Sequence, residues 1–273
     1  MNTKTLYTIE DLEYEEIPRL AELPPRSWEF DIVSFMQRFY HRPWFYALKA
    51  VSDDKIAGTG SIIFNNGTSW LSNIIVDPRY RGQGLGRAIT TRLMDISSEM
   101  DCPTYLLMAT EEGHGLYEKL GFADDGVFCY YTSHVPLPYT VPQQVVPAAP
   151  GDGERLLELD RQVTGEDRAH MLADYLHTAY VFRQDGNVRG FYLPALGDEP
   201  VIASDAEAGT ALLGLKHASA GKTTVIPEEN QWAAEFFRTH GIEPFDCRTR
   251  MVHGPRPDWK PEGVFCRIEG YYC

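Results

Sequence analysis

A glycine-rich turn at residues 81–86, Arg-Gly-Gln-Gly-Leu-Gly, holds the residue types best suited to chemistry. It follows an apolar, β-branched run at 70–76 that ends at Asp77-Pro78, which is typical of a strand that stops at a turn. Apolar residues at helical spacing come next, from Leu85 to Ile96. A helix that begins here leaves backbone N–H groups unpaired at the positive end of its dipole, and glycine lets an anion approach them. The stretch therefore predicts an anion-binding site.

The spacing of these glycines differs from that of two common nucleotide-binding motifs. It is not the Gly-x-Gly-x-x-Gly of a dinucleotide-binding fold, and the Gly-Lys-Ser/Thr of a P-loop is missing. An ordinary strand-turn-helix corner, with glycines for close packing, is the alternative. The pattern Arg81-x-x-Gly84-x-Gly86, directly after Val-Asp-Pro, resembles the acyl-CoA pyrophosphate motif of the GNAT superfamily of N-acetyltransferases.

This resemblance implies acetyl-CoA as co-substrate and no metal. In such enzymes the end of the strand before the turn pairs with the pantetheine amides, and one of its N–H groups polarises the thioester carbonyl. The amides of the turn hold the pyrophosphate. By resemblance, the cofactor-binding residues are Ile74, Ile75, Val76, Arg81, Gly82, Gln83, Gly84, Leu85, Gly86 and Arg87.

A second resemblance to GNAT enzymes lies at residues 115–122, Gly-Leu-Tyr-Glu-Lys-Leu-Gly-Phe. In the family a tyrosine of this helix sits beside the CoA sulfur, where a phenol can give a proton to the leaving thiolate. Tyr117 is therefore the catalytic candidate. The alternative is a half-buried helix tyrosine with a structural hydrogen bond. Many members carry Asn seven residues earlier, where this chain has Thr110.

A base for the attacking amine does not stand out. Asn73 lies near the strand position where some relatives carry Glu, but an amide cannot take a proton. The same resemblance makes the helix after residue 27 part of the acceptor side, with Trp28, Glu29, Asp31 and Phe35 as contact candidates. The base options that remain are water relayed to Glu111, Glu112 or Asp31, or a group such as Asp160 or His114.

Patterning predicts an α+β fold with a mixed sheet for the first half of the chain. We expect strands at 3–9, 44–51, 55–64, 70–76, 103–109 and 127–135, and helices from 11, from 27, at 84–100 and at 110–120. Residues 136–151 hold five prolines and no charge, which predicts an extended linker. The predicted domains are therefore a catalytic domain at 1–135 and a second domain at 152–273.

The second half repeats the first. Residues 228–242, Glu-Glu-Asn-Gln-Trp-Ala-Ala-Glu-Phe-Phe-Arg-Thr-His-Gly-Ile, stand where residues 111–122 stand in the first half. The glycine-rich turn is replaced by a stretch containing Asp205 and Glu207, whose carboxylates would repel a pyrophosphate. The whole chain, including residues 159–168, resembles a bacterial tandem GNAT subfamily with a catalytic first domain and a degenerate second one.

Composition bounds the function further. The net charge of −14 over 273 residues argues against nucleic acid as a partner and is compatible with a cationic acceptor. The five cysteines form no Cys-x-x-Cys pair, so we expect them reduced, without a disulfide or a zinc site. No membrane span or signal sequence is evident, which favours a cytoplasmic protein. The expected activity is direct acetyl transfer to a primary amine of a small molecule or peptide, and the alternative is a CoA-dependent sensor without turnover.

Overall fold

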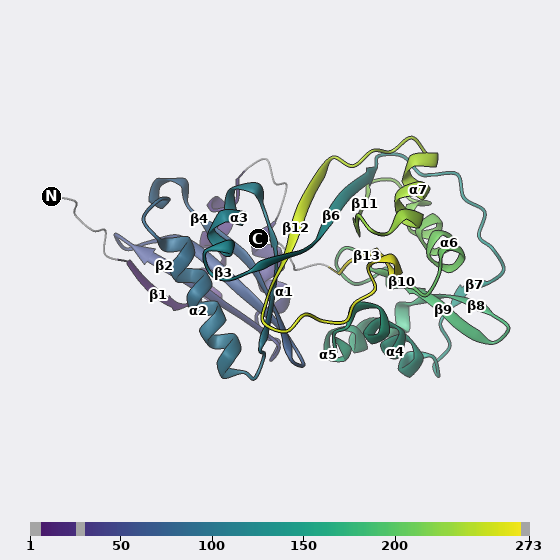
Figure 1. Cartoon of the computed structure of the whole chain (residues 1–273), viewed down its shortest axis with the longest axis horizontal. Coiled ribbons are helices and arrows are strands. Elements are labelled where there is room, and N and C mark those ends of the chain that lie inside the picture. The colour runs from purple at the N-terminus through teal and green to yellow at the C-terminus, as the bar shows by residue number, and fades with distance from the viewer. Residues whose placement is uncertain (1–6, 26–30, 269–273) are drawn as a thin grey trace. The chain divides into compact units, whose positions relative to one another are not determined.

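The computed structural model describes residues 7–25 and 31–268, which form two compact units (Figure 1). The first unit runs up to Ala123 and also contains Met251–Pro255. The second unit contains Asp124–Arg250 and the described residues after Pro255. None of the helices in the described parts is long and apolar enough to cross a membrane.

The first unit alternates strands and helices in nearly the predicted order. Two predictions fall partly outside the described residues, namely the start of the first strand and residues 26–30 of the second helix. Its elements are β1 (Tyr7–Asp11), the 3-10 helix η1 (Tyr14–Glu22), α1 (Ile32–Phe39), β2 (Phe45–Ser52), β3 (Lys55–Asn65), β4 (Thr68–Val76), the 3-10 turn η3 (Pro78–Tyr80), α2 (Leu85–Glu99), β5 (Thr104–Ala109) and α3 (Glu111–Glu118).

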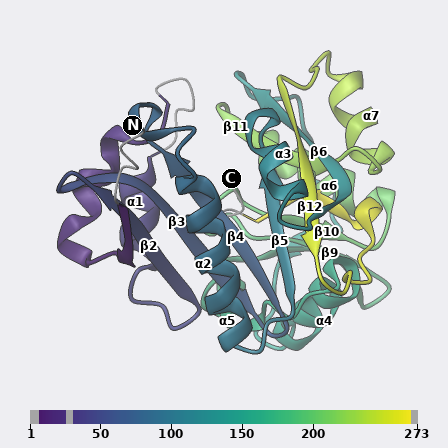
Figure 2. The ribbon, with the colours of Figure 1, turned by 60° about the vertical axis from the view of Figure 1, so that its left-hand side comes forward.

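The sheet of the first unit is mixed, as the sequence predicts. Strands β1 to β4 pair antiparallel in sequence order, whereas β5 lies parallel to β4 (Figure 2). The β4–β5 register covers only Thr68–Thr104, Ser69–Tyr105 and Trp70–Leu106. Within the described chain, the last residues of β4, Ile74 to Val76, therefore lie beyond the register of β4 with β5. An open backbone edge results.

Helix α2 packs on this sheet through its apolar face, and two glycines of β3 let it lie close. A Cβ added at Gly60 would stand 2.6 Å from Ile89 and 2.9 Å from Leu93. Both side chains are fully buried, together with Leu85 at the start of the helix. The helical spacing that the sequence predicts is thus the spacing of core contacts.

The second unit repeats this alternation with a separate five-stranded sheet in the order β13-β10-β9-β8-β7. Its elements are β6 (Ala123–Ser133), β7 (Val145–Pro147), α4 (Gly153–Thr164), α5 (Ala169–Leu172), the 3-10 helix η4 (Ala173–Thr178), β8 (Tyr180–Gln184), β9 (Asn187–Tyr192), β10 (Val201–Ala203), α6 (Ala206–His217), β11 (Lys222–Pro227), α7 (Gln231–Thr239), β12 (Asp246–His253), the 3-10 turn η5 (Pro261–Gly263) and β13 (Val264–Cys266).

The proline-rich residues 136–151 lie within the second unit instead of between two domains. The N–H of Leu137 donates to the carbonyl of His217 at 2.8 Å, and the Tyr139 hydroxyl donates to the carbonyl of Ala211 at 2.6 Å. Strand β7 is part of the same stretch and pairs with β8. The prolines do favour extended backbone, but apolar side chains such as Leu137 and Val145 are buried in this unit.

Strand β12 begins in the second unit and ends in the first. The predicted domain boundaries place the whole of this strand in the second domain. Met251–Pro255 belongs to the first unit, where the His253 ring stacks on Tyr105 at 5.3 Å between centroids. The Thr104 hydroxyl donates to the carbonyl of Pro255 at 2.7 Å. The first unit is therefore completed by residues from near the end of the chain.

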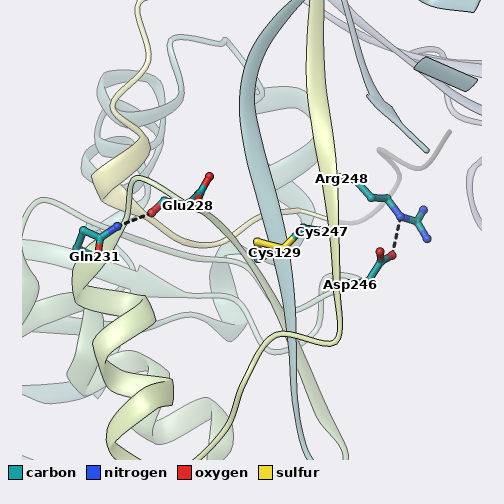
Figure 3. The surroundings of a disulfide bond; sticks show 6 residues. All are labelled: Cys129, Glu228, Gln231, Asp246, Cys247 and Arg248. Atoms are coloured by element: carbon teal, nitrogen blue, oxygen red, sulfur yellow. Dashed lines mark hydrogen bonds and ion pairs between the residues drawn. A yellow bond between two sulfur atoms is a disulfide. The ribbon is translucent and has the colours of Figure 1, made fainter. Parts of the chain in front are cut away.

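A disulfide joins Cys129 of β6 to Cys247 of β12 (Figure 3), so the expectation of reduced cysteines without a disulfide is wrong. The two residues are 118 positions apart, and only the pairing of their strands brings them together. Spacing rules read local motifs such as Cys-x-x-Cys, so they could not reveal this pair. Cys102 and Cys266 are free and buried.

Removing this disulfide should destabilise the fold, because the cross-link closes a long loop in the unfolded chain. We expect a Cys129→Ala, Cys247→Ala variant to lose about 2–4 kcal/mol of unfolding free energy in urea titrations. Dithiothreitol should lower the stability of the wild type to a similar degree and leave the variant unchanged. A thiol titration of the native protein that finds all five cysteines free would contradict the disulfide.

Candidate active site

A cavity of about 650 Å³ opens in the first unit where β4 ends and α2 begins. Its walls come from the end of β4, the turn after η3, the first turn of α2 and one face of α3. The lining residues are Ile74, Ile75, Val76, Tyr80, Arg81, Gly82, Gly84, Leu85, Gly86, Arg87, Thr110, Glu112, Gly113, Gly115, Leu116, Tyr117 and Lys119.

The turn that enters α2 is built from left-handed glycines. Gly82 has a φ of 73° and Gly84, the N-cap residue, a φ of 90°. A Cβ at Gly82 would meet nothing within 4 Å, and one at Gly84 would meet only the Tyr7 hydroxyl at 3.8 Å. These glycines are therefore needed for backbone conformation, since left-handed φ disfavours other residues. They also leave open space above the turn.

The start of α2 lacks a side-chain cap among the described residues, because glycine stands at the N-cap. The first N–H groups of a helix have no partner within the helix, and in most helices a side-chain oxygen accepts from one of them. Here these donors face a cavity at the positive end of a helix dipole. The arrangement can bind an anion through backbone amides alone.

The corresponding helix of the second unit, α6, has the opposite arrangement. Asp205 is its N-cap, and the carboxylate accepts from the N–H of Ala208 at 3.1 Å. Arg189 donates to the same carboxylate at 2.7 and 2.8 Å. Burial pulls the pKa of Asp205 upward, but hydrogen bonds from Arg189, Ala208 and Ser204 outweigh burial and hold the pKa below its usual value. A fixed carboxylate thus occupies the anion position of this helix.

Strand β4 supplies the second wall of the cavity. Ile74, Ile75 and Val76 all line it, in the part of β4 that lies beyond its register with β5. Backbone groups on such an unpaired edge can pair with an extended ligand as another strand would. The predicted residues of the strand therefore meet the predicted residues of the turn in one cavity.

Tyr117 lies on α3 and lines the same cavity with 3% of its surface exposed. A Cβ added at Gly113 would come within 3.0 Å of the Tyr117 ring, so glycine one helical turn earlier makes room for it. The Phe122 ring packs edge-on at 6.0 Å. Thr110 caps α3 by accepting from the N–H of Gly113 at 3.2 Å. The tyrosine is thus both a core residue and part of the cavity wall.

Arg81 connects three walls of the cavity. Its Nε donates to the carbonyl of Val76 at 3.1 Å, and its Nη1 donates to both oxygens of Glu112 at 2.7 and 3.0 Å. Glu112 belongs to α3 and has 71% of its side chain exposed. A carboxylate therefore lies on the wall of a cavity whose backbone favours anions.

Most of the residues that the sequence predicts for the co-substrate site line this one cavity. Of the predicted cofactor residues, only Gln83 does not line the cavity. Glu112, which the sequence offered as a possible base, lines the cavity, and so do Leu116 and Lys119, which were not predicted to do so. Their spacing of three to four residues along one helix face was an available signal. Other unpredicted lining residues are Tyr80, Thr110, Gly113 and Gly115.

Several proposed base and acceptor residues have other roles in the structure. Asp31 caps α1 by accepting from the Ser34 N–H at 3.0 Å, and hydrogen bonds from the Ser34 side chain and backbone lower its pKa. Phe35 is 2% exposed in the core, whereas Trp28 and Glu29 lie outside the described residues. Glu111 and His114 do not line the cavity.

Asp160, the base candidate from the second half, is a buried structural residue. It is 1% exposed and receives a hydrogen bond from Arg168 Nε at 3.0 Å. Burial raises the pKa of Asp160, and the adjacent guanidinium opposes that shift. Among the described residues, no group of three or more His, Cys, Asp or Glu side chains could hold a metal ion.

Comparison with known proteins identifies the family. The family described as "Acetyltransferase (GNAT) family" matches residues 4–122, and the "Acetyltransferase (GNAT) domain" matches residues 156–266. The chain is 32% identical over 124 residues to the glucosamine 6-phosphate N-acetyltransferase of Trypanosoma brucei brucei, covering 40% of this chain and 78% of the relative. It is 30% identical over 180 residues to YitH, an uncharacterized N-acetyltransferase of Bacillus subtilis (strain 168), covering 62% of this chain and 63% of YitH.

Solved structures agree on the fold. A Pyrococcus horikoshii protein superposes with a TM-score of 0.81 at 22% identity, covering 98% of this chain and 96% of that one. A tandem GNAT protein from the clavulanic acid biosynthesis pathway superposes with a TM-score of 0.64 at 16% identity, covering 92% and 100%. The chain therefore belongs to the GNAT family of acetyltransferases and carries two GNAT domains in tandem.

Proposed function

We propose that the protein transfers the acetyl group of acetyl-CoA directly to a primary amine in the cavity of the first unit. The observation that carries this proposal is the start of α2 without a side-chain cap, which lines the same cavity as Tyr117. An anionic co-substrate with an extended arm matches both the amides of this turn and the open edge of β4. Since acetyl-CoA is held inside cells, we place the protein in the cytoplasm.

The residues of the cavity fit the parts of acetyl-CoA. Amides from Gly82 to Arg87 would hold the pyrophosphate, because no Cβ at Gly82 or Gly84 obstructs it. Backbone groups of Ile74–Val76 would pair with the pantetheine arm, and one N–H there would stabilise negative charge on the thioester oxygen. The co-substrate supplies the activated acyl carbon. The protein supplies position and hydrogen-bond donors.

Tyr117 is proposed as the acid of the reaction. As a neutral amine attacks the thioester carbon, the new C–N bond forms, the C–S bond breaks and the sulfur leaves as a thiolate. The Tyr117 hydroxyl gives its proton to this sulfur, while the amine's surplus proton passes to solvent. The half-buried-tyrosine alternative and this role are compatible, since the ring packs in the core beside the cavity.

We further infer that the second unit does not bind CoA. Asp205 already fills the anion position at the start of α6 and is held there by Arg189. A pyrophosphate would have to displace a carboxylate that accepts both backbone and guanidinium hydrogen bonds. The proposal therefore assigns one co-substrate site to each chain.

For the acceptor we propose a small amine or a peptide N-terminus. Relatives named for their substrates include the glucosamine 6-phosphate enzyme above. Another is a Bacillus subtilis protein named as a [ribosomal protein bS18]-alanine N-acetyltransferase, 27% identical over 139 residues and covered to 91% of its length. Both named substrates present a primary amine. The net charge of −14 is compatible with an amine that arrives as a cation.

Calorimetric titration with acetyl-CoA tests the proposed site. We expect the wild type to bind about one acetyl-CoA per chain, and a Gly84→Glu, Gly86→Glu variant to bind none, because both side chains would place charge in the amide cradle. Gly67→Glu is the matched control, since Gly67 also has a left-handed φ, of 85°, but does not line the cavity. Absence of binding to the wild type would overturn the proposal.

Substitution of the tyrosine tests the acid. We expect Tyr117→Phe to lower kcat for thiol release by roughly 100-fold or more, with acetyl-CoA affinity nearly unchanged, because the ring and its packing are retained. Tyr80→Phe is the control, since Tyr80 is another tyrosine that lines the same cavity. Equal rates for Tyr117→Phe and wild type would remove Tyr117 from the mechanism. Tight acetyl-CoA binding with no turnover on any amine would indicate the sensor alternative.

We expect the negative charge of Glu112 to oppose the binding of acetyl-CoA. It holds Arg81 in an ion pair and repels a pyrophosphate nearby, so Glu112→Gln should tighten acetyl-CoA binding by about 2–5-fold at low salt. Glu111→Gln removes the same charge from the same helix, outside the cavity, and should change the affinity less. Weaker binding by Glu112→Gln would mean that the ion pair supports the bound state.

A further inference from the structure

Strand β13 lies among elements of the second unit that correspond to the walls of the cavity in the first. Strand β10 precedes α6 as β4 precedes α2, and β11 and α7 follow as β5 and α3 do. One edge of β10 pairs with β9, as β4 pairs with β3, and the other edge pairs with β13 (Figure 1). The segment 264–268 therefore lies along the edge that is open at the end of β4.

The backbone of this segment is bound on both sides. Strand β13 pairs antiparallel with β10, where Cys266 lies opposite Val201. The N–H of Arg267 donates to the carbonyl of Val225 in β11 at 3.0 Å. An extended peptide that adds to a sheet edge is held by main-chain hydrogen bonds of this kind. The segment is thus bound between β10 and β11 as a peptide ligand would be.

Asn230 binds the backbone of the segment through a fully buried side chain. Its Oδ1 caps α7 by accepting from the N–H of Ala233 at 2.9 Å. Its Nδ2 donates to the carbonyl of Val264 at 3.0 Å. An aspartate could supply the same cap, but it has no N–H group to donate to a carbonyl. The hydrogen bond to β13 therefore accounts for asparagine at this N-cap.

The Phe265 side chain fills a space that a glycine of α6 provides. Its ring is fully buried, and a Cβ added at Gly209 would stand 2.1 Å from it. The indole of Trp232 in α7 stacks on the same ring, with 6.4 Å between centroids. Glycine within a helix is less stable than alanine, and the close approach of the ring accounts for glycine here. The helices thus form a fitted space for one aromatic side chain of the segment.

A buried lysine contacts the next side chain of the segment. Lys216 of α6 is 1% exposed, and its Nζ donates to Cys266 Sγ at 3.1 Å and to the carbonyl of Glu199 at 3.3 Å. It also donates to the carbonyl of Asp198. A buried ammonium group needs such acceptors because burial removes its water. This position of the segment therefore favours a small side chain that can accept a hydrogen bond.

We propose that the second unit contains a peptide-binding site, which this chain fills with its own residues 264–268. The ligand class is an extended peptide with an aromatic side chain followed by a small one, since these enter the spaces beside Gly209 and Lys216. The proposal goes beyond the proposed function, and none of its contacts involves acetyl-CoA. It treats β13 as a ligand that can be exchanged, in contrast to a strand on which the folding of the unit depends.

Cleavage of the chain before this segment tests whether the site accepts a peptide. A protease recognition sequence is inserted after the exposed Arg256, before Pro257, and the folded protein is cut there. A fluorescent peptide of residues 257–268, with Cys266→Ser to prevent disulfide exchange, is then added in excess. Fluorescence anisotropy should show it binding to about one site per cut chain, and roughly 10-fold or more weakly to the uncut protein, because an attached segment competes at high effective concentration.

Matched substitutions identify the contacts that matter. Phe265→Ala in the peptide should weaken binding by roughly 10-fold or more, because the ring is fully buried, whereas Glu262→Gln, at an exposed position, should not change it. Asn230→Asp in the protein keeps the acceptor that caps α7 and removes the Nδ2 donor, so affinity should fall by about 5–10-fold. Equal binding of all the peptides would show non-specific association and overturn the site.

The state of the cut protein decides between an exchangeable ligand and a core strand. If circular dichroism shows that the cut protein unfolds, or if it stays folded and takes up no peptide, β13 is an integral strand and the proposal is wrong. In the intact chain, Gly209→Ala would place a methyl group against the Phe265 ring, so hydrogen exchange of amides 264–268 should rise by roughly 10-fold or more while β8 and β9 stay protected. Loss of protection throughout the unit would contradict the proposal. These measurements use no acetyl-CoA, so a failure of the proposed function would leave their result unchanged.

Discussion

The unpaired backbone N–H groups at the start of α2 are the constraint on which the site depends. Glycine at the N-cap of a helix is less stabilising than Ser, Thr, Asp or Asn by about a few tenths of a kcal/mol. This chain accepts that cost at Gly84 and surrounds the donors with space instead of protein atoms. The rest of the first unit follows from it, because the strand before the turn, the helix after it and α3 must all leave that space open.

The separation of β4 from β5 provides the second half of the site. Parallel strands normally stay paired along their length, and their backbone groups are then unavailable to a ligand. Here the register of β4 with β5 extends to Trp70 and Leu106, and a bulge opposite Gly60 of β3 follows within β4. Core packing continues through both features, because Ile62, Leu71 and Leu107 remain fully buried. The backbone at the end of β4 is thus available to a ligand while the apolar core of the unit stays buried.

Local patterns predicted the elements, and the failures occurred where structure depends on distant residues. The run at 70–76, the turn at 81–86 and the spacing from Leu85 to Ile96 each encode their own conformation, and they appear as β4, the cavity turn and α2. The Cys129–Cys247 pair and the return of Met251–Pro255 to the first unit depend on which strands become neighbours. No local pattern carries that information. Likewise, the prolines of 136–151 predict extended backbone but not the unit on which it packs.

The first turns of α2 and α6 differ in how each domain treats the positive end of its helix dipole. Both α2 and α6 follow a strand and begin a buried helix, and both concentrate positive potential at their first turn. At α2 the chain leaves that potential for a ligand, whereas at α6 it neutralises the potential internally with Asp205 and balances the carboxylate with Arg189. An internal anion is always present at high effective concentration, so it competes with any soluble one. Under the proposed function, the N-cap residue of each helix would then set which of the two domains binds the co-substrate.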